Sequence, residues 1–227
     1  MFISGPYEFI SDDGLDQAEK QAWLPLLQAY GALGYDAGAF TPLEAKAMAE
    51  LGGSAPANWL TLAAAEPVST VIERSGRKIG VVYFPEGKKP GDGPNDKAAQ
   101  AIARKLKELR GSVDLVVGVS PWGTNAESEY LEKTKPELDI LLGSGSGVGF
   151  SAKTANAGRT LWMRTYSKGK AVYTVDVLAW PGAKNFKWEQ GTSFTTQAVV
   201  LDENFPADPA MEKLLENVPD PGDKQAK

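Results

Sequence analysis

The sequence of 227 residues contains no cysteine and no histidine. Without cysteine, the chain has no disulfide, no thiolate metal ligand and no thiol nucleophile. Without histidine, it lacks the usual general base near neutral pH and the commonest transition-metal ligand. A Ser-His-Asp triad and a zinc site built on His or Cys ligands are therefore excluded.

Long apolar runs and a strong charge excess are absent as well. No run approaches the roughly 18 apolar residues that a membrane span needs, and no signal peptide opens the chain, so we expect no membrane span. The formal net charge of -5 argues against a protein that binds nucleic acid through bulk electrostatics. The apolar fraction of 42% is ordinary for a soluble globular protein, and the length suits one large α/β domain or two small ones.

Strands and helices alternate in the middle of the chain. Three runs rich in β-branched and apolar residues predict buried strands at residues 78–84, 113–119 and 139–142. Between them, an apolar stripe predicts a helix over residues 96–110, which Asn95 caps, and a short helix lies near residues 127–133. This alternation implies an α/β arrangement.

Two helices are predicted before this region. The first spans residues 12–33, where Pro25 is expected to kink it, and it leads into a short extended piece at residues 34–37. The second runs to about Leu51 and begins at Thr41-Pro42-Leu43-Glu44, which has the form of a capping box with proline at the first helical position.

The last third of the chain changes character. Residues 159–166 and 171–180 flank the turn Ser167-Lys168-Gly169-Lys170 and predict a β-hairpin. A further strand is expected at residues 195–201 and a closing helix at residues 209–216. Beyond Pro219 the composition predicts a disordered tail or a linker. We therefore expect a single domain over residues 1–218 and a flexible tail over residues 219–227.

The order of these segments resembles the 5′-nucleotidase family of the calcineurin-like metallophosphoesterases. The resemblance rests on five pieces in family order: LGYDA (residues 33–37), RKIGVVYF (77–84), VDLVVGVSPWG (113–123), ELDILLGSGSG (137–147) and VVLDENFPADPAMEKLL (199–215). It implies two mixed β-sheets flanked by helices, with two metal ions at the strand ends. The Asp-x-His strand that opens the family's domain has no match in this chain, so we expect an N-terminally truncated version with an exposed sheet edge.

The resemblance also places the family's metal ligands on residues that cannot coordinate a metal. The Gly-Asp pair falls on Gly5-Pro6, and Gly-Asn-His-Glu falls on Thr41-Pro42-Leu43-Glu44. The Ser-His pair falls on Ser120-Pro121, and both histidines of Gly-Gly-His-Ser-His fall on Gly145 and Gly147. A two-metal phosphoesterase holds its cations roughly 3.5–4 Å apart, and proline, leucine and glycine side chains offer no lone pair. We predict a pseudoenzyme with no catalytic residue, no metal and no cofactor.

Five residues of this degenerate cleft are candidates for binding a ligand: Glu44, Ser120, Trp122, Ser144 and Ser146. Each has an alternative. Glu44 suits a helix cap equally well, Trp122 either stacks on a ligand or partner or packs over the emptied site, and Ser120 has no visible base to activate it.

Two further sites are open alternatives. The loop of residues 143–149 either cradles a phosphate with its N–H groups or is a relic of a metal loop, since it fits neither G-x-G-x-x-G nor the G-K-[ST] ending of a P-loop. Asp12-Asp13, Asp92 and Asp96 are candidates for an all-oxygen Mg²⁺ or Ca²⁺ site, or else are helix-cap and loop residues.

Three functions remain at this point. The first is a non-catalytic domain retained for protein binding or assembly, with another protein or a second copy pairing at the exposed sheet edge. The second is a hydrolase of phosphate esters or nucleotides with an all-oxygen metal site. The third is a binder of nucleotides or small molecules without turnover, although the family's nucleotide-binding C-terminal domain has no match here. The resemblance implies a periplasmic or cell-surface location.

Overall fold

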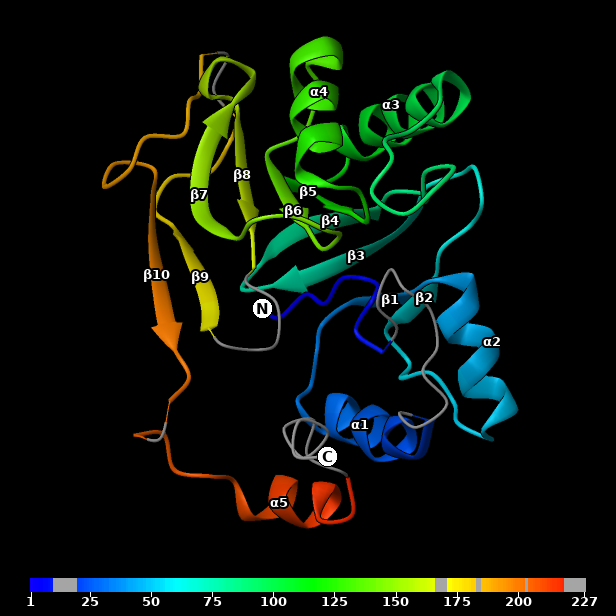
Figure 1. The fold of residues 1–227 in the computed structure, drawn as a ribbon. Helices are drawn as coiled ribbons and strands as arrows, with labels where there is room; N and C mark the ends of the chain where they lie inside the picture. The colour runs from blue at the N-terminus through cyan, green and yellow to red at the C-terminus, as the bar shows by residue number, and fades with distance from the viewer. Residues whose placement is uncertain (10–19, 166–170, 183–184, 203, 219–227) are drawn as a thin grey trace.

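A computed structural model describes residues 1–9, 20–165, 171–182, 185–202 and 204–218. It is a mixed α/β structure built on a six-stranded sheet with the strand order β3-β4-β5-β6-β8-β7 (Figure 1). The strands of this sheet are β3 (Val68–Arg74), β4 (Arg77–Tyr83), β5 (Leu115–Ser120), β6 (Ile140–Gly143), β7 (Phe150–Ala155) and β8 (Thr160–Arg164).

The four inner strands are parallel, and the two outer ones are antiparallel to their neighbours. Every residue of β5 and β8 is buried, which is the pattern of parallel strands covered on both faces. The predicted strands at 78–84, 113–119 and 139–142 are confirmed as β4, β5 and β6. Their carboxyl ends lie along one edge of the sheet.

Two helices cover one face of this sheet, α3 (Asp96–Arg110) and α4 (Thr124–Thr134) (Figure 1). Ile102 and Leu106 of α3 pack with Val82, Val116 and Leu131 in one apolar cluster. The bounds of α3 are as predicted, and Asn95 caps it by accepting a hydrogen bond from the N–H of Ala98 at 2.9 Å. Because local signals set both features, the sequence predicted them well.

The other face is covered by two pairs of strands. One pair is parallel, β1 (Gly38–Phe40) with β2 (Trp59–Thr61), and the other is antiparallel, β9 (Ala171–Val177) with β10 (Phe194–Val200). Ala39, Val81, Val117 and Phe194 share a single core between these layers. The expected sandwich is present, with a second layer made of separate strand pairs.

The remaining helices are α1 (Lys20–Ala32), α2 (Pro42–Glu50) and α5 (Pro209–Leu215), with a short 3-10 turn, η1 (Asn156–Gly158), between β7 and β8. Trp23, Phe40 and Met48 form a separate cluster between α1, α2 and β1. Pro25 lies inside α1, the kink expected there stays a prediction, and α5 contacts α1. No helix in the described part of the chain is long and apolar enough to span a membrane.

Several predictions need correction. The strands at 159–166 and 171–180 do not form a hairpin, because β8 pairs with β6 and β7 whereas β9 pairs with β10. Strands β2 and β3 were not predicted, and the extended piece at 34–37 begins later, as β1. The start of the first helix, the turn at 167–170 and the tail from Pro219 lie outside the described residues.

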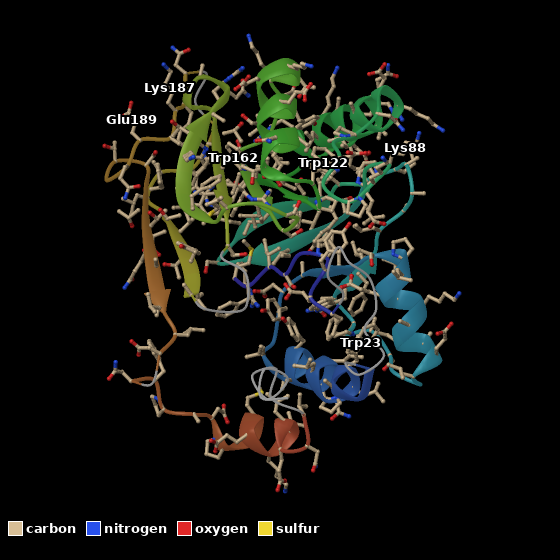
Figure 2. All side chains as sticks on the ribbon, in the orientation of Figure 1. Trp23, Lys88, Trp122, Trp162, Lys187 and Glu189 are labelled. Atoms are coloured by element: carbon tan, nitrogen blue, oxygen red, sulfur yellow. The ribbon has the colours of Figure 1, made fainter. Side chains whose placement is uncertain are left out.

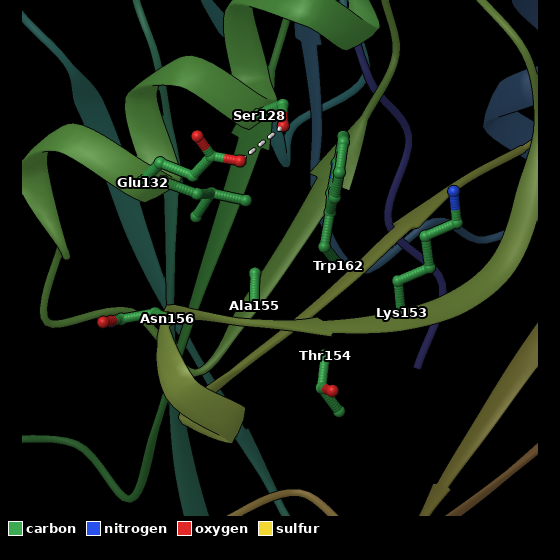
Figure 3. Close-up of a pocket in the computed structure, with 8 residues that line it drawn as sticks. Ser128, Glu132, Lys153, Thr154, Ala155, Asn156 and Trp162 are labelled. Atoms are coloured by element: carbon green, nitrogen blue, oxygen red, sulfur yellow. Dashed lines mark hydrogen bonds between the residues drawn. The ribbon is translucent and has the colours of Figure 1, made fainter.

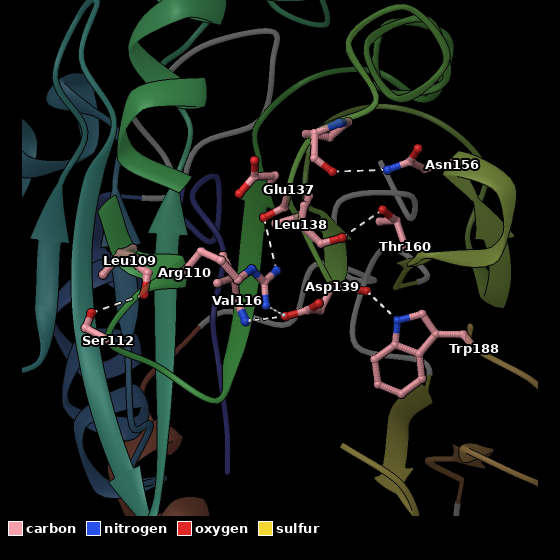
Figure 4. A network of polar contacts seen from close by, with 11 residues as sticks. Leu109, Arg110, Ser112, Val116, Glu137, Leu138, Asp139, Asn156, Thr160 and Trp188 are labelled. Carbon is pink, nitrogen blue, oxygen red and sulfur yellow. Dashed lines mark hydrogen bonds and ion pairs between the residues drawn. The ribbon is translucent and has the colours of Figure 1, made fainter. Parts of the chain in front are cut away.

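A polar network holds the amino end of β6 (Figure 4). The predicted site lies at the other end of this strand. Asp139 accepts hydrogen bonds from Arg110 at 2.8 Å and from the N–H of Val116 at 2.7 Å. Its carbonyl oxygen accepts the indole N–H of Trp188 at 2.9 Å. These contacts tie the amino end of β6 to α3, to β5 and to Trp188, and they help to fix the position of β6 beside β5.

Candidate functional site

Two of the segments that carry the family resemblance, residues 113–123 and 137–147, meet at the carboxyl ends of β5 and β6. Ser144, just after β6, donates from both its backbone N–H and its hydroxyl to the carbonyl oxygen of Ser120, at 2.8 and 2.9 Å. Gly5 lies so close that a Cβ atom placed on it would overlap the Ser144 side chain. The structure therefore brings Ser120, Ser144 and Gly5 together, as the resemblance implies.

Glu44 is fully buried, and its carboxylate accepts hydrogen bonds from backbone N–H groups of the protein. Together with Thr41 it forms the predicted capping box of α2. The carboxylate accepts the backbone N–H groups of Thr41 at 2.8 Å, Phe9 at 3.1 Å and Tyr7 at 3.2 Å. Burial raises the pKa of the Glu44 carboxyl, and these hydrogen bonds act in the opposite direction. The cap is thus confirmed, and the tie to the N-terminal segment is a role that the sequence did not reveal.

Trp122 and Ser120 are core residues. The ring of Trp122 is completely buried, with the rings of Phe84 and Tyr130 each 5.2 Å away between centroids (Figure 2). Its indole N–H donates to the carbonyl of Pro85 at 2.8 Å. The hydroxyl of Ser120 is also buried and accepts the N–H of Trp122 at 3.1 Å. Protein atoms enclose both side chains, so the surroundings favour the packing alternative for Trp122, and ligand binding by these two residues stays a prediction.

The loop of residues 143–149 turns its carbonyl oxygens toward a buried cation. Arg164, at the end of β8, donates to the carbonyls of Trp122 at 3.3 Å, Ser146 at 2.8 Å and Gly145. The carbonyl of Ser146 also accepts the N–H of Thr124 at 3.2 Å. A phosphate cradle requires inward-facing N–H groups, so this geometry does not support that alternative. Ser144 is half-buried and Ser146 is exposed.

Arg164 is held in turn by an ion pair that the sequence analysis missed. Its guanidinium lies 2.5 Å from a carboxylate oxygen of Glu127 in α4, and the two side chains are 2% and 0% exposed. The same oxygen accepts the indole N–H of Trp162 at 2.8 Å. Burial raises the pKa of the Glu127 carboxyl, although Arg164 acts in the opposite direction. A charged residue ending the apolar run TLWMR was the only sequence signal for this pair.

The residues present do not fit a two-metal centre. A Cβ atom on Gly145 would overlap the carbonyl oxygens of Pro121 and Trp122, and one on Gly147 would overlap the hydroxyl of Thr124. Gly147 also has φ at +133°, where side chains are strained. Neither position accommodates a histidine in this backbone. Among the described residues, no group of three or more His, Cys, Asp or Glu is arranged to hold a metal ion.

The all-oxygen alternative receives no support from the aspartates that the structure describes. Asp92 accepts the N–H of Lys89 at 3.1 Å within its own loop. Asp96 lies in the first turn of α3, where a carboxylate interacts favourably with the positive end of the helix dipole. Asp12 and Asp13 lie outside the described residues.

A small pocket lies elsewhere, between α4 and the β7–β8 hairpin (Figure 3). Its volume is about 190 Å³, and its lining includes Ser128, Glu132, Lys153, Asn156 and Trp162. Ser128 donates to Glu132 at 3.4 Å across one side of it. None of the five predicted ligand-binding residues lines it.

No protein-family model matches the sequence, and no curated protein does. Two solved structures, both from Thermus thermophilus, are similar in fold. The 5′-nucleotidase precursor is 14% identical with a TM-score of 0.58, over 86% of this chain and 46% of that protein. The sulfate thiohydrolase SoxB is 14% identical with a TM-score of 0.65, over 94% and 41%. This chain spans less than half the length of either. At such identity the likeness concerns the fold, which is the 5′-nucleotidase-like calcineurin-type metallophosphoesterase fold.

Proposed function

We propose that this chain is a non-catalytic protein of the metallophosphoesterase fold, retained for protein binding or assembly. The observation that carries the proposal is the packing at Gly145 and Gly147. The carbonyl oxygens of Pro121 and Trp122 and the hydroxyl of Thr124 occupy the space that ligand side chains would need there.

The electrostatics of the same place support the proposal. A two-metal site concentrates several anionic and neutral donors around cations. Here the cation is the Arg164 guanidinium, with Glu127 as its counter-ion and carbonyls of the loop as acceptors. The guanidinium already occupies the carboxylate of Glu127 and the carbonyls of Gly145 and Ser146, so these oxygen atoms are not free to hold a metal cation.

A domain whose interior site is filled by its own atoms can still bind another protein through its surface and its sheet edges, which suits a binding or assembly role. An exported location, which the family resemblance implies, belongs to the same proposal. Fractionation of the source cells with an antibody against the chain would test it, and recovery with the cytoplasmic fraction would contradict it.

The first test is elemental analysis of the native purified protein by inductively coupled plasma mass spectrometry. The same preparation is assayed for phosphatase, nucleotidase and phosphodiesterase turnover with Mg²⁺, Mn²⁺ or Ca²⁺ added. We expect no stoichiometric metal and no turnover above the buffer control.

A stoichiometric metal, or turnover that follows the protein through purification, would overturn the proposal. Substitution of Asp92 and Asp96 by asparagine would then show whether an all-oxygen site carries that activity, because the amide lacks the carboxylate's charge. Exposed Glu212→Gln is the matched control at a site distant in the fold.

A further inference from the structure

Strand β3 lies at the end of the six-stranded sheet, and no strand among the described residues pairs with its outer edge. The even-numbered residues of β4 bond toward β5, as the hydrogen bond from the N–H of Phe84 to Val119 and that from Asp114 to Lys78 show. The odd-numbered residues of β4 therefore bond toward β3, where Ile79 pairs with Ile72. It follows that the N–H and C=O groups of Ser69, Val71 and Glu73 point away from the sheet.

The two edges of the sheet differ in how they are protected. The edge strand β7 has an irregular register between Phe150 and Lys153, carries that lysine, and contacts β10. Bulges, lysines and covering segments are the usual defences against pairing with another chain. Strand β3 pairs with β4 in unbroken register and contains no lysine or proline; its charged residues, Glu73 and Arg74, lie at its end, and β2 contacts it. At its centre, Val71 is 49% exposed.

The outward-facing groups of β3 are self-complementary in one antiparallel register. If Val71 faces Val71 of a second copy, Ser69 of each chain faces Glu73 of the other, and all three outward-facing residues are used. Centring the pair on Glu73 brings Glu73 opposite Glu73, a like-charge pair that is destabilising. Centring it on Ser69 places Glu73 opposite residue 65, which precedes the strand, so both shifts use fewer of the outward-facing residues. The central register joins two exposed valines.

Charged groups lie near the strand ends, on the face of the sheet that α3 covers. Arg104 of α3 lies 3.8 Å from Glu66, which precedes β3, and both side chains are more than half exposed. Ser69, Val71 and Glu73 lie on the face of the sheet that α3 covers, since they pair with Val82, Gly80 and Lys78. In the central register, Glu73 of the second copy comes beside Ser69, on the side where Arg104 lies.

We propose that two copies of this chain associate through antiparallel pairing of their β3 strands, centred on Val71, into one continuous sheet. This inference rests on the proposed assembly function and names its partner. It requires no metal and no turnover, so its failure would leave a non-catalytic protein that binds a different partner.

The first experiment measures the dissociation constant of the wild-type chain by sedimentation velocity over a concentration series. Val71→Lys places two positive charges opposite each other at the centre of the pairing, and we expect it to weaken the dimer at least tenfold. Val172→Lys is the matched control, because Val172 is an exposed strand valine on β9. We expect it to dimerise as the wild type does.

The second experiment tests the register and does not depend on the lysine variant folding. The chain has no cysteine, so Val71→Cys introduces a single thiol. Residues facing each other in a hydrogen-bonded antiparallel pair have Cα atoms about 5.5 Å apart, which suits a disulfide. Under mild oxidation we expect Val71→Cys to give a covalent dimer, and Val172→Cys to give only the collision background. Ser69→Cys should cross-link with Glu73→Cys in a mixture more than either does alone.

A wild-type chain that stays monomeric at all concentrations up to tens of micromolar would overturn the inference. So would a dimer that Val71→Lys leaves intact, or a Val71→Cys chain that cross-links no faster than the Val172→Cys control. A stoichiometric metal in a dimer with this register would instead overturn the proposed function and leave the interface in place.

Discussion

Replacing Arg164 by methionine would leave Glu127 buried beside Trp162 without its counter-charge. The side chain is 2% exposed and its partner 0%, so solvent cannot compensate for the lost charge. Methionine retains much of the length and apolar volume, so the substitution acts mainly by removing the guanidinium. The loop carbonyls of Gly145 and Ser146 would lose their donor at the same time.

Breaking a buried ion pair from one side costs about 3–5 kcal/mol, because the remaining charge is uncompensated. For a chain of this length, 1 kcal/mol corresponds to about 2–4 °C in the melting temperature. We therefore expect Arg164→Met to lower the melting temperature by about 6–20 °C. The loss should extend to the loop of residues 143–149, whose amide hydrogens should exchange faster.

The assays are thermal unfolding, which gives the melting temperature, and urea unfolding, which gives the free energy. Both are followed by tryptophan fluorescence, and hydrogen exchange is measured on the same variant. The double variant Glu127→Leu/Arg164→Met removes both charges, and we expect it to recover most of the stability. A single variant that loses less than about 1 kcal/mol would refute the reasoning. A double variant whose loss equals the sum of the two single losses would also refute it, because the pair would then be uncoupled.

Three further predictions concern the filled site. Gly145→Ala should destabilise the fold by about 1–3 kcal/mol, because its Cβ meets backbone carbonyls that cannot rotate away. Gly31→Ala, which lies in open space on α1, should stabilise the fold by about 0.5–1 kcal/mol in the same denaturation assay. Equal effects of the two substitutions would contradict this reasoning. Trp122→Ala should cost about 3–5 kcal/mol and Trp122→Phe clearly less, and a near-neutral alanine variant would show that the ring is not a core element. Glu44→Gln should be less stable than the wild type by an amount that shrinks as pH rises from about 4 to 7. A carboxyl whose pKa is raised in the folded state stabilises it below the unfolded pKa and loses that contribution at higher pH. A difference that widens with pH would contradict the assigned direction.

Local signals account for what the sequence predicted well. The helix capped by Asn95 and the capping box at Thr41 and Glu44 depend on contacts within four residues, and both are present. The buried strands β4, β5 and β6 were visible because parallel strands read as continuous apolar runs. Strand β3 escaped notice because its exposed edge position tolerates Ser69, Thr70 and Glu73, which interrupt the apolar pattern.

Contacts between distant segments account for the errors. The predicted hairpin had a good turn signal, yet all of β8 is buried in the middle of the sheet between β6 and β7. Within the site, the resemblance predicted which residues fall at the family's ligand positions, but the sequence did not indicate what fills the space. Glu127 and Arg164 come from different elements, and no local pattern indicates that two such charges meet.

The glycines of the loop also constrain how the chain can change over generations. A histidine at position 145 or 147 would first require the backbone around Pro121 and Thr124 to move. Either histidine alone would lower stability, and neither alone would complete a metal site. Selection that acts on one substitution at a time would therefore meet a loss before any catalytic advantage. The packing of this loop therefore makes the first step toward a histidine-based metal site unfavourable.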